Sequence, residues 1–441
     1  MLTPKHLCTL ACYALMCATT THAQELPLWL VPTPPAPATL LPWMGNVHVL
    51  TSQVDADFNG VQDEGDVPAQ WIAVDATTRE RVMARTLPWG SNYVNRSAMA
   101  AGSLFTHHGD TLVQYDIATG DVRTVAVTGA VSVAVNTNAA FAAAAVRPSF
   151  TDPGKVLLID ISSGEIKGEY PVGINPGALY IEFGTNAMNK DIFRIVVVCE
   201  GLFGQPSSQL NIVTIDASDY TATEQIVELG DTGNGLFVID QSQRPEEEHI
   251  ALITMNGSHS VVAVDLNEGK VVGTLDVGTT GYDGPRELAF RDDGHTFVST
   301  FASDVREFNY DGDRVATYLP GGKPEGLLIV NDQLWVTRTF VEGGFAADSG
   351  VAVFDLDDMP TSVHEEQRPL QTSVWPLPAT THVNVRGVGQ HAAIISATGM
   401  QYNVPVVVTA DGVARFRVEA LPNGVYAVRD GLVVHRFVVQ R

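Results

Sequence analysis

Short apolar runs recur along most of the chain, and each ends in Asp or Asn before a polar turn. Each run has the length and alternation of a β-strand, and the turn that follows is typical of a hairpin. The units recur at intervals of 41 to 56 residues, at 71–75, 112–116, 156–160, 212–216, 261–265, 305–309 and 351–355. This spacing suits one four-stranded propeller blade, so the pattern predicts an all-β fold with a seven-bladed β-propeller over residues 42–360.

The residues between the runs support this prediction. Gly164 and Gly269 stand where a hairpin needs a positive φ, a conformation that glycine adopts without steric conflict. Pro176, Pro285 and Pro324 follow glycines just before the next apolar run. Proline is tolerated at the first position of a strand because its missing N–H is not needed there. These residues therefore mark the turns and the beginnings of strands.

One stretch carries a family resemblance. The pattern over 260–265, 271–278 and 285–299 resembles the YVTN repeat of bacterial surface β-propellers. The strand that gives the repeat its name is approximated at 297–300 and at 335–338. The resemblance extends roughly over residues 42 to 360. It implies an extracellular propeller, a class that also includes lactonases and quinoprotein dehydrogenases.

The last part of the chain, residues 373–441, forms a separate pattern. Its alternating apolar and polar positions predict two packed antiparallel sheets, a small Ig-like β-sandwich. The opening 375–379, the motif 421–426 and the basic ending resemble the type A C-terminal sorting domain of the type IX secretion system of Bacteroidetes-type bacteria. Trp375 and Leu377 stand where that family usually has Tyr and Asn. The resemblance implies that the secretion machinery is a partner and that this domain is an export signal.

The beginning of the chain carries a second export signal. Two basic residues precede an apolar stretch over 7–18, and a small-residue site places cleavage before Gln24. Residues 1–23 are therefore predicted to be a secretory signal peptide. Residues 24–41 form a Pro-rich lead, expected to be extended and to lie along the propeller, and 361–372 form a polar linker before the C-terminal domain.

The net charge of the chain indicates which classes of molecule it can bind. Acidic residues outnumber basic ones by 50 to 26, a net charge of −24, which repels nucleic acid and anionic lipid and attracts cations.

Three of the 4 cysteines lie in the predicted signal peptide, where a lipid-modified Cys12 or Cys17 is the alternative interpretation. Cys199 then remains alone and is expected to be a buried strand thiol. No other stretch has the length of a membrane span, which predicts a soluble, secreted or outer-surface protein that passes through the periplasm.

The strongest chemical motif is the acidic segment 55–66. Asp55, Asp57 and Asn59 occupy positions 1, 3 and 5 of an EF-hand-type calcium loop, with Gly60 at the sharp turn. The remaining predicted ligands are the carbonyl of Val61 and the side chains of Asp63 and Asp66. The segment resembles dockerin-like and thrombospondin-type-3 loops. Alternate oxygen ligands around a tight turn predict a calcium site, and a solvated acidic turn is the alternative.

A weaker candidate site lies where the innermost strands begin, around the central funnel of the propeller. Repeat alignment places Gly177 there together with the polar residues Asn234, Arg286 and Glu325, and Glu287 lies close by. They could bind a polar ligand, and the alternative is a structural ion pair on a wet surface.

No catalytic motif accompanies these features. The chain has no nucleophile elbow, phosphate-binding loop, dinucleotide fingerprint or zinc helix. The leading hypothesis is a calcium-stabilised, non-enzymatic propeller that binds or adheres to an extracellular protein or glycan. Two alternatives remain open: a lactonase-like or other hydrolase or oxidoreductase with its site in the funnel, and a structural component of a surface layer.

Overall fold

The computed structural model describes residues 23–90, 96–136, 140–185, 190–239, 249–279 and 283–356, followed by 374–375, 381–386, 393–396, 400–408, 413–430 and 433–439. Within these residues all regular secondary structure is β-strand. Among them, no helix has the length and apolarity needed to cross a membrane. Residues 1–22 of the predicted signal peptide and the predicted linker 361–372 lie outside the described residues.

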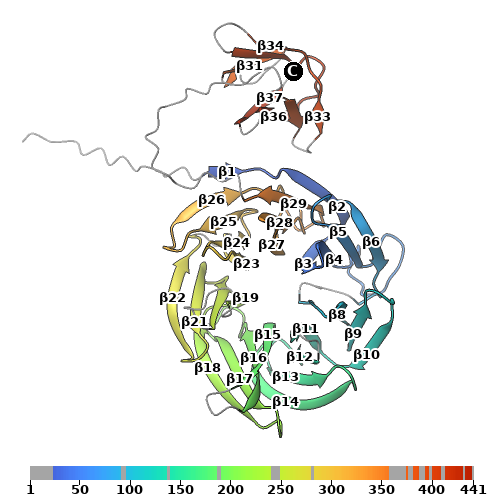
Figure 1. Ribbon diagram of the computed structural model, residues 1–441, viewed down its shortest axis with the longest axis vertical. Helices are drawn as coiled ribbons and strands as arrows, with labels where there is room; N and C mark the ends of the chain where they lie inside the picture. The colour runs from blue at the N-terminus through green and yellow to red at the C-terminus, as the bar shows by residue number, and fades with distance from the viewer. Residues whose placement is uncertain are drawn as a thin grey trace, which may run out of the picture.

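The described residues between 23 and 356 form mainly antiparallel sheets arranged around a common axis (Figure 1). In most of these sheets, successive strands follow one another from the axis outward, so that neighbours in sequence are hydrogen-bonded. The first sheets are β3 (Pro37–Trp43), β4 (Asn46–Thr51), β5 (Gln70–Asp75) and β6 (Arg81–Thr86); β7 (Ala98–Ala100), β8 (Ser103–His108), β9 (Thr111–Asp116) and β10 (Val122–Ala126); and β11 (Ala130–Val135), β12 (Phe141–Val146), β13 (Pro153–Asp160) and β14 (Glu165–Ile174). The next are β15 (Pro176–Thr185), β16 (Asp191–Cys199), β17 (Ser208–Asp216) and β18 (Ala222–Gly230); and β19 (Gly233–Ile239), β20 (Ile250–Met255), β21 (Ser260–Asp265) and β22 (Lys270–Asp276).

The last two sheets also contain strands from the beginning of the chain. One comprises β23 (Pro285–Phe290), β24 (Thr296–Thr300), β25 (Val305–Phe308), β26 (Arg314–Tyr318) and, parallel to β26, β1 (Ala23–Glu25). The other comprises β27 (Leu327–Val330), β28 (Gln333–Thr337), β29 (Ser349–Asp355) and, as its outermost strand, β2 (Trp29–Pro35). The ring is thus closed by pairing the two ends of the repeat region within one sheet.

This closure corrects the prediction for the Pro-rich lead. Residues 29–35 and 37–43 are strands β2 and β3, so the sheets begin before residue 42. The prolines occupy positions at which no ladder hydrogen bond is needed, at the edge of a sheet or at the first residue of a strand. The lead is extended, as expected, but most of it belongs to the sheets.

The repeated run that ends in Asp is the third strand of its sheet, or lies within it. The terminal carboxylate then accepts backbone N–H groups of the following turn. For example, Asp75 Oδ1 accepts from Thr77 at 2.9 Å and from Thr78 at 2.7 Å. Asp160 and Asp265 form the same pair of bonds in their turns. Asp recurs at this position because its side chain satisfies the backbone donors of the turn to the fourth strand.

Apolar residues are buried between neighbouring sheets, not at the axis. One cluster joins Phe193 and Ile195 of β16 to Leu158 of β13, in the sheet before it. A cluster of the same kind joins the last sheet to the first and contains Val31 of β2 and Trp335 of β28. The faces of the sheets are therefore the core, and their axial edges are free to carry polar residues.

The C-terminal residues form two further sheets. Their orders are β30 (Val374–Trp375), β31 (His382–Arg386), β35 (Val413–Arg417) and β34 (Val406–Val408), and β33 (Gln401–Tyr402), β32 (Ala393–Ser396), β36 (Gly424–Asp430) and β37 (Val433–Val439). Both sheets contribute to a single buried cluster, with Phe416 from the first and Phe437 from the second. Within the 421–426 motif, Leu421 is buried and the Tyr426 hydroxyl donates to the Pro422 carbonyl at 2.8 Å. The motif therefore stabilises the local fold.

Candidate functional site

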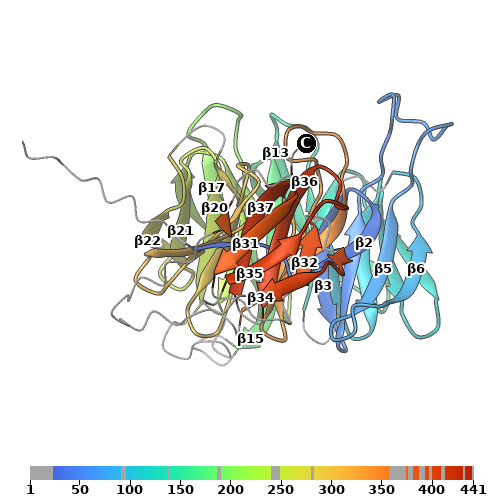
Figure 2. The same cartoon turned by 90° about the horizontal axis from the view of Figure 1, so that it is seen from above.

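The strand order places several loops on one side of the ring. In an antiparallel sheet the first and third strands run the same way. The connections from second to third strand therefore lie on the side where the innermost strands begin. We call this side the front face and define it by the connections 52–69, 147–152, 200–207 and 338–348. The first of these, drawn in blue, extends beyond the sheets in Figure 2.

The structure brings the predicted funnel residues together on this face. Arg286 on β23 pairs with Glu325 of the next sheet, with Nη2 at 2.8 Å from Oε2 and 3.0 Å from Oε1. Glu287 pairs with Arg96 at 3.2 Å. Arg96 also donates to the Asn234 backbone carbonyl at 3.0 Å. Charged side chains from several sheets thus converge where the inner strands begin.

Sequence reasoning missed three charged residues of this group and the amide side chain of Asn175, which bonds to two of them. Arg96 lies just before β7, and Asn175 lies between β14 and β15. Arg147 and Glu200 directly follow the second strands of neighbouring sheets. The sequence pattern could have identified Arg147 and Glu200, because a charged residue that directly follows an apolar second strand lies on the face where the innermost strands begin. We call Arg96, Arg147, Glu200, Arg286, Glu287 and Glu325 the axial cluster.

Burial and opposite charges set the protonation of this cluster. Burial raises the pKa of Glu287, and the Arg96 guanidinium opposes that rise. Burial also raises the pKa of Glu200, against the opposing effect of Arg96, Arg286 and Arg147. For Arg286, burial lowers the pKa, but Glu325 and the other glutamates outweigh it and the net shift is upward. The cluster alternates positive and negative groups, as partly desolvated charges require.

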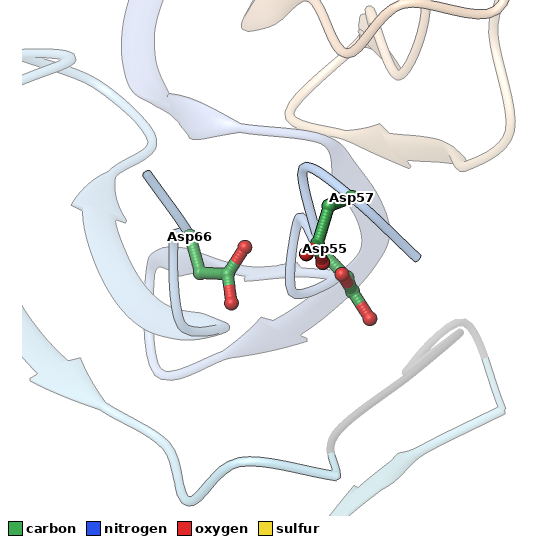
Figure 3. Close-up of side chains that lie close together, drawn as sticks. All are labelled: Asp55, Asp57 and Asp66. Atoms are coloured by element: carbon green, nitrogen blue, oxygen red, sulfur yellow. The ribbon is translucent and has the colours of Figure 1, made fainter. Parts of the chain in front are cut away.

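The acidic segment forms a closed loop between β4 and β5. Val54 and Val67 pair at its base through backbone hydrogen bonds of 2.8 and 2.9 Å. Carboxylate oxygens of Asp55, Asp57 and Asp66 lie within 4.8 Å of one another. Figure 3 shows the Asp66 carboxylate turned toward Asp55 from the opposite arm of the loop. Three of the predicted ligands therefore already converge.

Hydrogen bonds hold the other predicted ligands nearby. The Asn59 amide nitrogen donates to Asp57 Oδ2 and to Asp63 Oδ2, each at 2.8 Å. Asp66 accepts the backbone N–H groups of Ala56 and Asp63. Burial would raise the pKa of Asp55, but backbone donors led by Gly60 lower it overall, and its Oδ1 is buried without a hydrogen bond in the described residues. Hard oxygen donors in a turn of this size fit a calcium ion.

Other chemically suggestive side chains are accounted for by packing. Cys199 is buried on β16, and burial raises its pKa to about 12, which removes it as a nucleophile at neutral pH. His107 is buried, whereas His108 lies 2.9 Å from the Tyr115 hydroxyl, so the pair does not share one ligand position.

Sheets of four or five strands around a common axis, with polar residues at the axial strand ends, define a β-propeller-like all-β protein. No protein-family model matches the chain, and no curated protein sequence is similar to it. Among solved structures, the chain is similar to hydrazine synthase from Kuenenia stuttgartiensis, with 12% identity and a TM-score of 0.45, over 63% of this chain and 84% of that one.

Proposed function

We propose that the chain is an exported, seven-bladed β-propeller that acts as a non-enzymatic binding module on the outer cell surface or in the medium. The YVTN-like repeat and the two export signals support the location. The observation that carries the binding role is the axial cluster, in which Arg286–Glu325 and Glu287–Arg96 pairs from different sheets face the front. This arrangement offers fixed donors and acceptors and contains no nucleophile–base pair among the described residues.

The direct test separates a binding surface from structural ion pairs. Arg286→Met with Glu325→Leu replaces one ion pair by apolar groups of similar size, which leaves no buried charge unpaired. If the pair serves binding, the double variant melts like the parent and loses adhesion to the cell or matrix surface that retains the parent. Lys155→Met with Glu169→Leu, at an exposed pair away from the axis, is the matched control. Unchanged adhesion in the axial variant contradicts the proposal.

In the same proposal the acidic loop binds calcium. Asp55, Asp57 and Asp66 would hold the ion, with Asp63, the Val61 carbonyl and, after its amide turns, Asn59 completing the shell. The ion would neutralise the loop and fix the connection on the front face. Metal content by mass spectrometry and thermal melts with calcium and with EDTA test this for the parent and for Asp57→Ala. One calcium per chain, lost in the variant with a lower Tm, is expected, and Asp311→Ala in an exposed turn is the control.

The other outcomes of this experiment are equally informative. Absence of calcium from the parent refutes the metal assignment. A transition metal that persists in Asp57→Ala would place a second metal near the axis and favour the enzyme alternative.

The C-terminal sheets are proposed to form the Ig-like sorting domain of the type IX secretion system. Two four-stranded sheets over a single buried cluster support a sandwich, as does the 421–426 motif. Removal of residues 373–441 is expected to leave the chain in the periplasm of a host with this secretion system. Surface delivery of the truncated chain contradicts the assignment.

A further inference from the structure

One sector of the front face repeats a short pattern in two neighbouring sheets. Arg147 follows β12 and Phe150 stands three positions later, while Glu200 follows β16 and Phe203 stands three positions later. In each connection a charged residue lies at the base, directly after the strand, and the aromatic residue follows three positions later. In the first connection the Arg147 guanidinium lies over the Phe150 ring, 4.3 Å from its centroid. The rings of Phe150 and Phe203 are 68% and 100% exposed, whereas the side chains at the base are only partly exposed.

Asn175 joins the two charged groups into a continuous polar strip. The Arg147 Nη1 donates to Asn175 Oδ1 at 2.7 Å, and Asn175 Nδ2 donates to Glu200 Oε2 at 2.6 Å. Asn175 is buried and has a φ of 57°, a strained conformation for a residue other than glycine. The three planar side chains are therefore held in a fixed row.

Hydrogen-bonding capacity remains on both sides of this row. Within the described residues, the Arg147 side chain donates one hydrogen bond, and the Glu200 side chain accepts one side-chain hydrogen bond, at Oε2. Three further polar atoms, the Arg147 Nε and Nη2 and the Glu200 Oε1, are not among the buried atoms that lack a partner. These atoms are therefore open to solvent or to a ligand. The strip thus presents free donors beside a free acceptor.

The loops that display the two rings are preorganised. Ser149 Oγ accepts the N–H groups of Thr151 and Asp152 at 3.1 and 3.0 Å, which forms a tight turn around Phe150. Ser207 Oγ accepts the Leu202 N–H at 2.7 Å beside Phe203. Covering the fully exposed ring of Phe203 would remove apolar surface from water, and a fixed loop lowers the entropy lost when such a ring is covered.

The chemistry of the strip selects a class of ligand. An incoming carboxylate would be repelled by Glu200, and an incoming cation would be repelled by Arg147. A neutral hydroxyl group both donates and accepts, so it satisfies a free guanidinium and a free carboxylate oxygen together. The apolar C–H faces of a sugar ring would cover Phe150 or Phe203. We propose that Arg147, Asn175, Glu200, Phe150 and Phe203 form a subsite for a neutral oligosaccharide, which specifies the ligand of the binding function proposed above.

The test is a titration calorimetry panel on the mature protein. The neutral probes are maltohexaose, cellohexaose, laminarihexaose, xylohexaose, mannohexaose and N-acetylated chitohexaose, and the comparators are polygalacturonate, heparin and a casein digest. At least one neutral probe is expected to bind. Phe203→Ala is expected to weaken that binding about tenfold, and Glu200→Gln by about tenfold or more because it removes a charged acceptor. Tyr310→Ala, a 69% exposed ring in a turn outside the front face, and Glu169→Gln are the matched controls and should leave the affinity unchanged.

Each contrary result refutes a distinct part of the inference. Absence of binding to every neutral probe refutes the ligand class. Binding of the casein digest or a charged polymer alone also refutes it, but leaves the front face as a binding surface. A neutral probe whose affinity survives both Phe203→Ala and Glu200→Gln places the sugar elsewhere on the molecule. Because Phe203 is fully exposed and Gln preserves the shape of Glu200, loss of folding does not explain a loss of binding.

Discussion

The closure of the ring by strand β2 is open to a precise test. Val31 lies in the middle of β2, pairs with Val351 of β29 and is 3% exposed within the cluster that joins the last sheet to the first. Its neighbour Leu30 points to the other side of the strand and is 37% exposed. The same strand therefore offers a buried position and a partly exposed control at adjacent residues.

The expected destabilisation follows from this burial. Val31→Ala removes two buried carbon groups at about 0.8 kcal/mol each and leaves a small cavity, about 2 kcal/mol in all. Leu30→Ala removes carbon groups that are already more than a third exposed and leaves no enclosed cavity, so it is expected to cost about 1 kcal/mol, roughly half as much. Val31→Asp, which places an unpaired charge in the same cluster, should cost several kcal/mol and prevent stable closure.

Urea denaturation of the mature protein, followed by tryptophan fluorescence, measures these differences. Trp335 is buried in the same cluster and reports on the junction between the last and first sheets. The midpoint is expected to fall for Val31→Ala with little change in slope, and to fall about half as far for Leu30→Ala. Equal effects of the two alanine substitutions would refute the argument that β2 closes the ring through its buried face.

Three further predictions concern protonation and the C-terminal sheets. Burial lowers the pKa of His48 to about 4 in the folded protein, so as the pH falls below the ordinary value of 6.5 the unfolded protein binds a proton at this residue before the folded protein does. The stability of the fold is therefore expected to drop between about pH 6.5 and 4. His48→Gln should make the melting temperature depend less steeply on pH over this range. The neutral ring is required because its Nδ1 accepts the Trp71 indole N–H at 2.9 Å. Tyr426→Phe removes the hydrogen bond to the Pro422 carbonyl and should destabilise the C-terminal sheets by about 1 kcal/mol, measured by proteolysis rate with Tyr402→Phe as control. Cys199 should resist iodoacetamide in the native protein and react in urea, as measured by intact mass; rapid native labelling would contradict its burial and raised pKa.

Local pattern was sufficient to predict the strands and their turns. The runs ending in Asp75, Asp160 and Asp265 are third strands, because period-two alternation and a carboxylate that caps the next turn both act within a few residues. The hairpin glycines Gly164 and Gly269 have φ values of 71° and 62°, so that prediction is confirmed. The acidic loop was found for the same reason, since its oxygen donors all come from one short segment.

Positions set by partners distant in sequence were not predictable in this way. Composition marked 24–41 as a lead because nothing within it shows that β29 supplies hydrogen bonds to β2. Repeat alignment found Arg286 and Glu325 because both lie near the start of an inner strand. It did not include Arg147 or Glu200, which reach the same face from the ends of second strands.

The sequence by itself determined which segments become strands, where they turn, and that one loop gathers carboxylates. Only the tertiary structure decided that the first strands complete the last sheets, and that Arg147, Asn175 and Glu200 form one polar row. The physical reason is the range of the forces involved. Backbone preference and turn capping depend on adjacent residues, whereas the row depends on how two neighbouring sheets pack through the buried cluster between β13 and β16.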